Sequence, residues 1–234
     1  MVKSPRATRI WVLSIITVLT QPTPDQKTKL YVLESYVLHQ GAQTAALHSW
    51  IQETWLPAHD GPAVVLDAVI AAQMPQVATL RGYASLEDWA GTRLTPPGSA
   101  NSAVTLLEPA SYSPELVAGA SEKGRIFEMR LYHSPSWPQW QLLHERFAGP
   151  EIKIFHRLGI NPVLYSSTIA GPHMPNLVYL TPFADLGERE RAWAAFMADP
   201  EWHKVRAESI ESGGQISQWM EITLWRAAAY SPVR

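Results

Sequence analysis

The side chains best suited to chemistry alternate along the predicted strand Phe127–Tyr132. Because neighbouring strand residues point to opposite faces, Glu128, Arg130 and Tyr132 share one face and the apolar residues between them share the other. If the apolar face packs beneath helices, the polar face points into the interior of the sheet assembly. An arginine or a tyrosine inside could there stabilise a developing oxyanion.

Glu34 takes the position of Arg130 in an earlier, similar strand. Pseudo-symmetry between the two strands would place Glu34 and Arg130 on related interior walls, where a buried charge needs a partner. Two interpretations stay open. In the first, these two residues form a structural ion pair. In the second, the polar residues line a ligand pocket whose candidates are Glu34, Glu128, Arg130, Tyr132, Tyr165 and His173.

Several common catalytic and cofactor signatures are absent from the sequence. It contains no Gly-x-Gly-x-x-Gly, no phosphate loop and no Gly-x-Ser-x-Gly. The eight histidines are scattered, and none pair at metal-ligand spacing. Cysteine is absent, which excludes disulfides, thiolate metal ligands and a cysteine nucleophile. The sequence therefore predicts no metal site and shows no evident cofactor.

The composition is that of a neutral globular protein. Of the 234 residues, 46% are hydrophobic and ten are tryptophan, so a packed core is expected. The formal net charge is −2, and no basic run is long enough to indicate binding to nucleic acid.

Residues 1–26 are expected to lie outside the fold. Three basic residues precede the apolar run Ile10–Leu19, which is the pattern of a secretory signal. The run is too short to span a bilayer comfortably, so no stable membrane span is expected. A cleaved signal would make the protein periplasmic or secreted. The alternative is an N-terminal extension of a cytoplasmic protein.

The remaining chain repeats one order of elements, β-α-β-β-α-β. The first four strands are expected at Lys29–Tyr36, Ala63–Ile70, Val77–Tyr83 and Val104–Leu107. The second four are expected at Arg125–Tyr132, Pro162–Ile169, Leu177–Thr181 and Ile216–Leu224. We therefore predict two repeats, 27–118 and 125–234, joined by a linker at 119–124. The first repeat is shorter and more diverged.

The stretch Gly171–Trp202 carries the clearest local signals. Asp185 stands three residues before Glu188, which is a capping-box pattern, and Asp199-Pro200 is the start of a second helix. A related helix start, at Ser85, lies in the first repeat. The order of elements is the ferredoxin-like split βαβ plan. Helices cover only one face of such a sheet, so we expect the two tandem units to pack sheet to sheet as one pseudo-symmetric α+β barrel.

The sequence resembles the NIPSNAP family in several segments. The strand at Phe127–Tyr132 is similar to the family's opening strand, and three further segments are similar to the family's sequence: Gly159–Val163, Gly171–Trp202 and Tyr230-Ser231-Pro232. Together these segments span nearly all of residues 125–234. The resemblance implies the dimeric α+β barrel fold, here with two copies in one chain. It brings no agreed catalytic residues.

Two functions from different classes follow. In the first, the barrel binds a small apolar or aromatic molecule and acts on it or simply holds it; the resemblance leaves haem and a homo-oligomer open. In the second, the protein is a non-catalytic interaction module with a filled interior. A pocket of several hundred Å³ between the sheets would favour the first, and a packed interior beside an exposed apolar patch would favour the second.

Overall fold

The structure is a computed structural model that describes residues 27–39, 41–98, 101–119 and 125–234. The expected signal segment, 1–26, lies outside the described residues. So does the predicted linker, except for Gly119.

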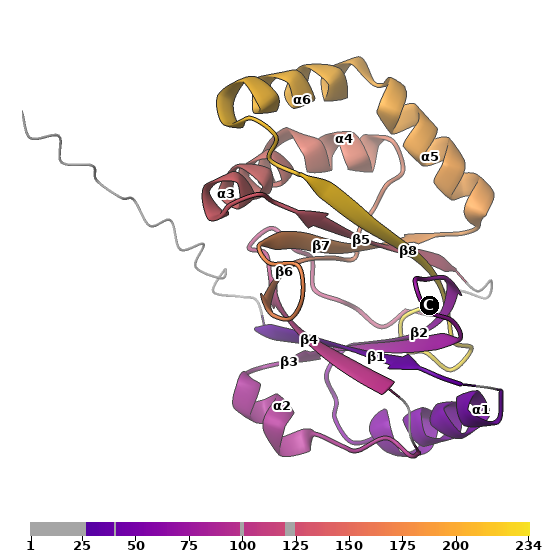
Figure 1. The fold of residues 1–234 in the computed structure, drawn as a ribbon. Helices are drawn as coiled ribbons and strands as arrows, with labels where there is room; N and C mark the ends of the chain where they lie inside the picture. Colours follow the sequence, from indigo (N-terminus) through magenta and orange to yellow (C-terminus); the bar gives the residue numbers. More distant parts are fainter. Residues whose placement is uncertain (1–26, 40, 99–100, 120–124) are drawn as a thin grey trace, which may run out of the picture.

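Eight strands close into one antiparallel barrel, in the order β1-β3-β2-β8-β5-β7-β6-β4 (Figure 1). The strands of the first half are β1 Leu30–Val37, β2 Ala63–Ile70, β3 Gln76–Tyr83 and β4 Asn101–Pro109. Those of the second half are β5 Ile126–His133, β6 Leu164–Ala170, β7 Asn176–Phe183 and β8 Trp219–Ala227. The predicted α+β barrel is thus confirmed.

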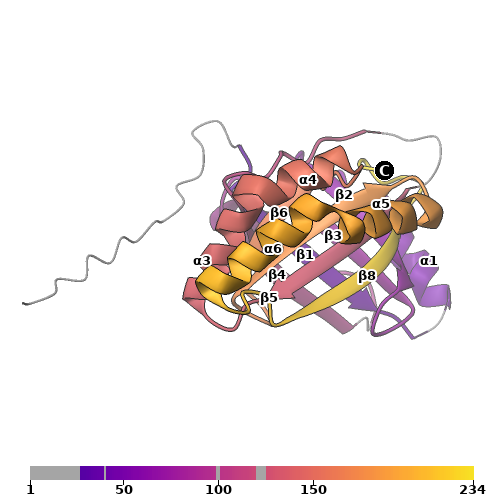
Figure 2. The same ribbon diagram turned by 90° about the horizontal axis from the view of Figure 1, so that it is seen from above.

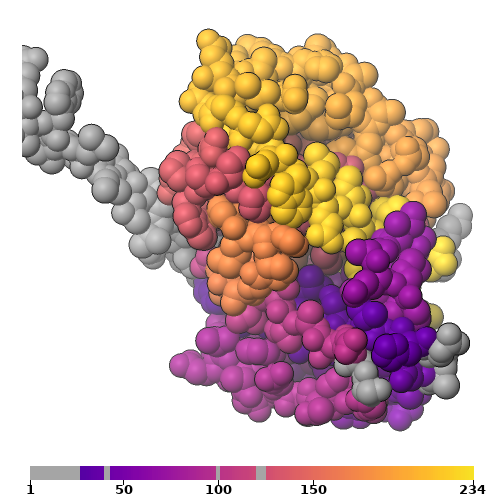
Figure 3. All heavy atoms as spheres, viewed as in Figure 1, coloured from indigo at the N-terminus to yellow at the C-terminus, as the bar shows by residue number. Residues whose placement is uncertain are grey.

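The barrel consists of two four-stranded sheets joined along both edges. Within the halves the strand orders are β4-β1-β3-β2 and β8-β5-β7-β6, which is the ferredoxin-like order in both cases. The sheets join where β2 pairs with β8 and β4 pairs with β6. Closure leaves the barrel with no free strand edge, which an open sheet would expose. Figure 3 shows the two halves packed directly against each other.

Helices cover the two outer sides of the barrel and leave its interior to side chains (Figures 1 and 2). On the first half lie α1 Gly41–Trp50, a π-helical segment at Ile51–Trp55 and α2 Leu86–Thr92. On the second half lie α3 Trp137–Arg146, a π-helical segment at Phe147–Glu151, α4 Ile152–Arg157, α5 Leu186–Ala198 and α6 Pro200–Gly213. Gly149 and Pro150 lie within the second π-helical segment, where Gly149 has non-helical backbone angles.

The helix starts follow the predicted caps. The side chains of Ser85, Asp185 and Asp199 each accept a hydrogen bond from the backbone N–H three residues on, at 3.1, 2.8 and 3.0 Å respectively. Such caps satisfy donors that the first helical turn leaves unpaired. The last strand begins at Trp219, later than the predicted Ile216. Ile216 instead packs in the core beneath the helices, and its carbonyl accepts a hydrogen bond from Ser134 Oγ at 2.8 Å.

Each half ends in a tail that contains Tyr-Ser-Pro, at Tyr112-Ser113-Pro114 and at Tyr230-Ser231-Pro232, and each tail contacts the other half. Ser113 Oγ accepts a hydrogen bond from the N–H of Tyr165, and Ser231 Oγ accepts one from the N–H of Val65, both at 2.9 Å. Beyond these serines, Leu116 and Val233 join the apolar core inside the barrel. One end of the barrel is therefore filled by both tails. That the halves are copies of one repeat stays a prediction.

The orientation predicted for the faces of β5 is wrong. Phe127, Met129 and Leu131 belong to the core inside the barrel, whereas Tyr132 belongs to the core beneath the helices. The alternation itself is as predicted, but both faces of this strand are covered. The barrel interior takes the purely apolar face because it offers few partners to a charge, while the helix side supplies donors for Glu128.

Candidate functional site

Glu128 and Arg130 form a buried charged cluster beneath α5. The Glu128 carboxylate is 0% exposed and accepts hydrogen bonds from Arg130 Nε and Arg189 Nε, and from Trp193 Nε1 at 3.2 Å. The Arg130 guanidinium lies over the Trp193 ring, 3.4 Å from its centroid. A buried carboxylate is tolerated here because three donors surround it.

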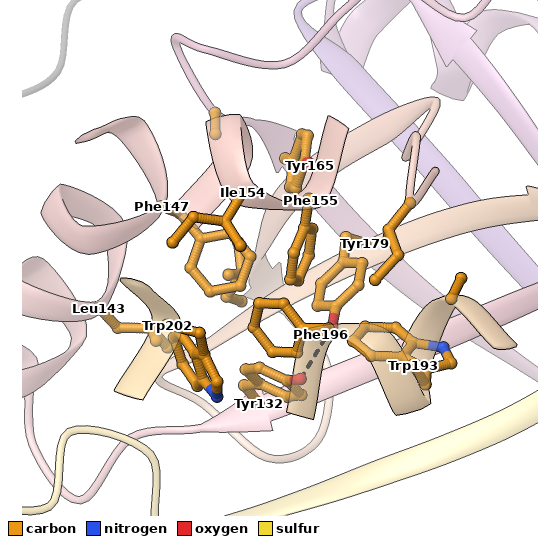
Figure 4. Close-up of a cluster of buried hydrophobic side chains, with 14 of the residues drawn as sticks. Tyr132, Leu143, Phe147, Ile154, Phe155, Tyr165, Tyr179, Trp193, Phe196 and Trp202 are labelled. Carbon is orange, nitrogen blue, oxygen red and sulfur yellow. Dashed lines mark hydrogen bonds between the residues drawn. The ribbon is translucent and has the colours of Figure 1, made fainter. Parts of the chain in front are cut away.

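Tyr132 extends this cluster to a second tyrosine. Its hydroxyl accepts hydrogen bonds from Arg130 Nη1 at 3.2 Å and from the hydroxyl of Tyr179 at 2.8 Å (Figure 4). Burial raises the pKa of Tyr179 well above its ordinary value, so the phenol stays protonated and remains a donor. Burial alone would lower the pKa of Arg130, but Tyr179, Tyr132 and Glu128 raise it above its ordinary value. The group is therefore held as a cation.

Glu34 does not share an interior wall with Arg130, and this prediction is wrong. Strand β1 lies on the opposite side of the barrel from β5 (Figure 1). On the outer face of β1, Glu34 accepts a hydrogen bond from the hydroxyl of Tyr36. Arg130 pairs with Glu128 in its own half. The same reversal of faces explains both placements, because each polar face lies under its own helices. The predicted ion pair between them does not form.

Tyr165 packs against Tyr179 at the edge of the cluster, with ring centroids 5.9 Å apart, whereas His173 lies apart from both. Tyr165 is 1% exposed and packs in the core beneath α3, near Tyr112, with ring centroids 5.4 Å apart. Burial raises its pKa. His173 lies on the exposed loop between β6 and β7, edge-on to Trp219. Of the six candidates, the structure thus brings Glu128, Arg130 and Tyr132 into direct contact and links Tyr165 to them through Tyr179. Glu34 and His173 lie elsewhere.

Two histidine networks were missed by the sequence reasoning. His144 on α3 contacts the hydroxyl of Tyr112 through Nδ1 at 2.8 Å and Ser167 Oγ through Nε2 at 2.9 Å. His48 on α1 contacts the hydroxyl of Tyr230 at 2.6 Å and Asp67 Oδ1 at 2.8 Å. In each network, the tail tyrosine of one half meets the first helix of the other. The repeated Tyr-Ser-Pro was the available signal.

His144 should make stability depend on pH. Burial lowers its pKa to about 4, against about 6.5 in the unfolded chain. The stabilisation is therefore full above pH 6.5 and is lost as pH falls towards 4, by about 3 kcal/mol in all. We expect urea titrations between pH 7 and 4 to show this loss in the wild type and a smaller one in His144→Gln. If stability falls equally with pH in both proteins, His144 is not the group responsible.

A cavity of about 630 Å³ opens at the barrel end opposite the tails. Its walls include the inward side chains of Leu33, Met129, Leu131, Val178 and Trp225. Polar side chains surround them towards the mouth, including Ser35, Gln73, Gln76, Ser102, Glu221 and Thr223. The loops after β2 and β6 both contribute to this lining. The cavity has the size and the mixed lining of a small-molecule site.

Thr168 gives the cavity a polar group that the protein does not satisfy. The residue is 3% exposed and lines the cavity, and its hydroxyl has no hydrogen-bond partner among the residues described. A buried hydroxyl without a partner costs free energy, and most such groups in native structures are paired. A bound molecule with a polar atom could satisfy it.

Asn176 shapes the loop at the cavity mouth. Its side chain is buried, accepts a hydrogen bond from the N–H of Thr168 at 3.0 Å and donates one to the carbonyl of His173 at 2.9 Å. His173 has a φ of 63°, a left-handed conformation that non-glycine residues seldom adopt. The amide therefore fixes a loop that would otherwise favour other conformations.

We expect Asn176→Ala to destabilise the protein by about 2 kcal/mol, because it leaves a buried N–H and a carbonyl without partners. The equivalent change at the half-buried Gln76 should cost less than half of this. Thermal and urea unfolding of both variants test the difference. Equal losses of stability in the two variants would show that the hydrogen bonds of Asn176 do not stabilise the loop.

Neither a metal centre nor a transmembrane helix stands out in the described ranges. There, no three histidine, aspartate or glutamate side chains come close enough together to hold a metal ion. Among the same residues, no helix combines the length and apolarity that crossing a membrane requires.

The closed eight-stranded barrel with outer helices places the chain among α+β barrel proteins, and solved structures share this fold. A candidate monooxygenase from Lactobacillus acidophilus is 8% identical, with a TM-score of 0.56 over 88% of this chain and 99% of that one. An anthrone oxidase-like protein is 10% identical, with a TM-score of 0.57 over 87% and 92%. A mutant chlorite dismutase from Candidatus Nitrospira defluvii is 8% identical, with a TM-score of 0.54 over 88% and 94%.

The sequence of the second half matches a known family. Residues 127–232, slightly less than half of the chain, match the NIPSNAP family model. The resemblance seen in the sequence is confirmed there. Among curated proteins, none matches the sequence.

Proposed function

We propose that this protein binds a small, mainly apolar or aromatic molecule inside its barrel. The observation that carries the proposal is the cavity of about 630 Å³ at the open barrel end. Its apolar walls favour a hydrophobic body, and the hydroxyl of Thr168 favours one polar atom on it. A completely filled interior, as the interaction module requires, does not agree with a hollow of this size.

The lining supports binding more strongly than it supports a particular reaction. Glu221 is the carboxylate at the mouth, and His173 is the imidazole. Both are exposed side chains. Catalytic groups are usually buried and held by close partners. Glu128 and Arg130 are held in this way, but they lie beneath the helices, outside the barrel cavity. The function proposed is therefore the binding of a ligand, and no catalytic role is assigned to the residues that line the cavity.

A substitution that fills the cavity tests the proposal. Ser35 lies on β1 and lines the cavity. Its replacement by Phe places a ring in the empty space and so avoids overpacking the core. We expect wild-type protein to bind the neutral fluorophore 1-aminoanthracene and Ser35→Phe to bind it at least about tenfold more weakly, which is a loss of ~1.4 kcal/mol. The readout is probe fluorescence during titration.

A phenylalanine on the surface provides the matched control. Ser212→Phe on α6 adds the same ring at an exposed position. This variant should bind the probe as the wild type does. If Ser35→Phe remains folded by circular dichroism and binds as well as Ser212→Phe, the barrel does not hold the probe. An absorbance scan of gently purified protein would in addition reveal haem or another coloured ligand.

A further inference from the structure

A second cavity lies outside the barrel, between the outer face of β5 and β8 and the helices α5 and α6. Its volume is about 430 Å³. Aromatic rings form much of its wall, as Figure 4 shows for Tyr132, Trp193, Phe196 and Trp202. Walls of this kind favour a planar ring, which stacks on them or meets them edge to face. This subhelical cavity is separate from the cavity inside the barrel.

One wall residue offers a hydrogen-bond donor that the protein does not use. Trp202 is 7% exposed, and its Nε1 has no partner among the described residues. In Figure 4 this nitrogen points towards Tyr132. An indole N–H can only donate, so what satisfies it must be an acceptor. The unused donor therefore points to an acceptor atom on a bound molecule.

The charges around the cavity favour an acceptor that is also an anion. Three guanidinium groups, those of Arg130, Arg146 and Arg189, face two fully buried carboxylates, those of Glu128 and Glu151. Glu128 is shared by two of the arginines, so the buried part of the cluster has one positive charge in excess. The further carboxylate that contacts Arg189, on Glu190, is 72% exposed and screened by water.

The mouth of the subhelical cavity is apolar. Met197 on α5, Ile210 on α6 and Met220 on β8 line it and remain 60%, 38% and 51% exposed. An anionic group is thus expected to enter first, while an apolar body stays in contact with the rim. A free inorganic anion would use the donors but would leave this rim uncovered.

We propose that the subhelical cavity binds an aromatic carboxylate. The carboxylate accepts from Trp202 Nε1 and balances the excess charge near Arg130. The ring packs against Trp193 and Phe196, which contact each other edge to face, and reaches the rim at Met220. This site is separate from the one proposed inside the barrel. Its ligand is an anion, whereas the barrel ligand is mainly apolar.

The test compares 2-naphthoate with the neutral 2-naphthamide by titration calorimetry on the full chain. The two probes share a ring system and differ in charge. We expect naphthoate to bind at least about tenfold more tightly, because hydrogen bonds to a charged group contribute more than neutral ones. Trp202→Phe, which removes the donor and keeps an aromatic ring, should weaken naphthoate binding about tenfold and should change naphthamide binding little. Trp140→Phe is the matched control, because Trp140 Nε1 already donates to the carbonyl of Asn176.

Two exposed or distant positions keep the test valid if Trp202→Phe folds poorly. Met220→Glu puts a negative charge at the exposed rim and should selectively weaken naphthoate binding. Ser35→Phe fills the barrel and should leave naphthoate binding unchanged. The proposal is overturned if both probes bind equally, if neither binds, if Met220→Glu has no effect, or if Ser35→Phe abolishes naphthoate binding.

Discussion

Replacing Glu128 by glutamine should destabilise the protein by about 3–5 kcal/mol. The carboxylate is fully buried and accepts from two arginines and one indole N–H, so its loss leaves two guanidinium groups without their shared counter-charge. Breaking a buried ion pair from one side costs more than the pair itself contributes. Urea unfolding at pH 7 measures the change in the free energy of unfolding.

The surface carboxylate of the same network provides the control. Glu190 contacts Arg189 but is 72% exposed, so Glu190→Gln should change stability by less than about 1 kcal/mol. Removing both buried charges, in Glu128→Leu with Arg130→Met, should restore part of the loss because fewer charges remain unpaired. If Glu128→Gln costs no more than Glu190→Gln, the buried network is not as described.

Arg81 should be the second position with a large effect. It is 2% exposed, donates to the carbonyls of Trp55 and Leu56 at 2.8 and 3.1 Å, and lies 3.7 Å from the centroid of the Trp55 ring. Burial lowers its pKa, so the cation is desolvated and depends on these contacts. We expect Arg81→Met to cost about 3 kcal/mol or more, as two carbonyls lose their donor and the cation–π contact is lost.

Two other substitutions sharpen the test at Arg81. Arg81→Lys keeps the charge but lacks the planar fork that reaches both carbonyls, so its cost should be intermediate. Arg93 lies over Trp89 at 5.7 Å and is exposed, so Arg93→Met should cost less than about 1 kcal/mol. Thermal unfolding ranks the three variants. If Arg81→Met leaves the stability unchanged, the carbonyls of Trp55 and Leu56 do not need the Arg81 side chain as a donor.

The order of elements could be predicted from the sequence because its signals are local. Alternating apolar residues, capping aspartates and prolines marked most strands and helices to within a few residues. Strand β2 was predicted at Ala63–Ile70, as observed. The last strand was placed too early, since Ile216 is apolar whether it lies in a strand or packs under a helix.

The orientation of the faces could not be predicted in the same way. Alternation in β5 separates Phe127 from Glu128, but it does not say which face meets the barrel interior when both are buried. Glu128 lies beneath α5 because Arg189 and Trp193, distant in sequence, supply donors there. Arg81 gave no local signal at all, because its partners are backbone carbonyls.

The histidine networks depend on contacts between the halves. His144 meets Tyr112 only because the first tail crosses to the second half, and His48 meets Tyr230 for the reciprocal reason. A single sequence shows the repeated tail residues but not which helix each tail contacts. The cavities could not be predicted from the sequence either, because they depend on how completely side chains from several strands fill the space between them.

A crystal structure of the protein with 1-aminoanthracene would test the central claim, ligand binding inside the barrel, most directly. We expect the ring system in the barrel cavity, packed against the wall formed by Met129 and Trp225, with its amino group within hydrogen-bond distance of the hydroxyl of Thr168. An interior closed by collapsed side chains, with the probe bound elsewhere or not at all, would contradict it.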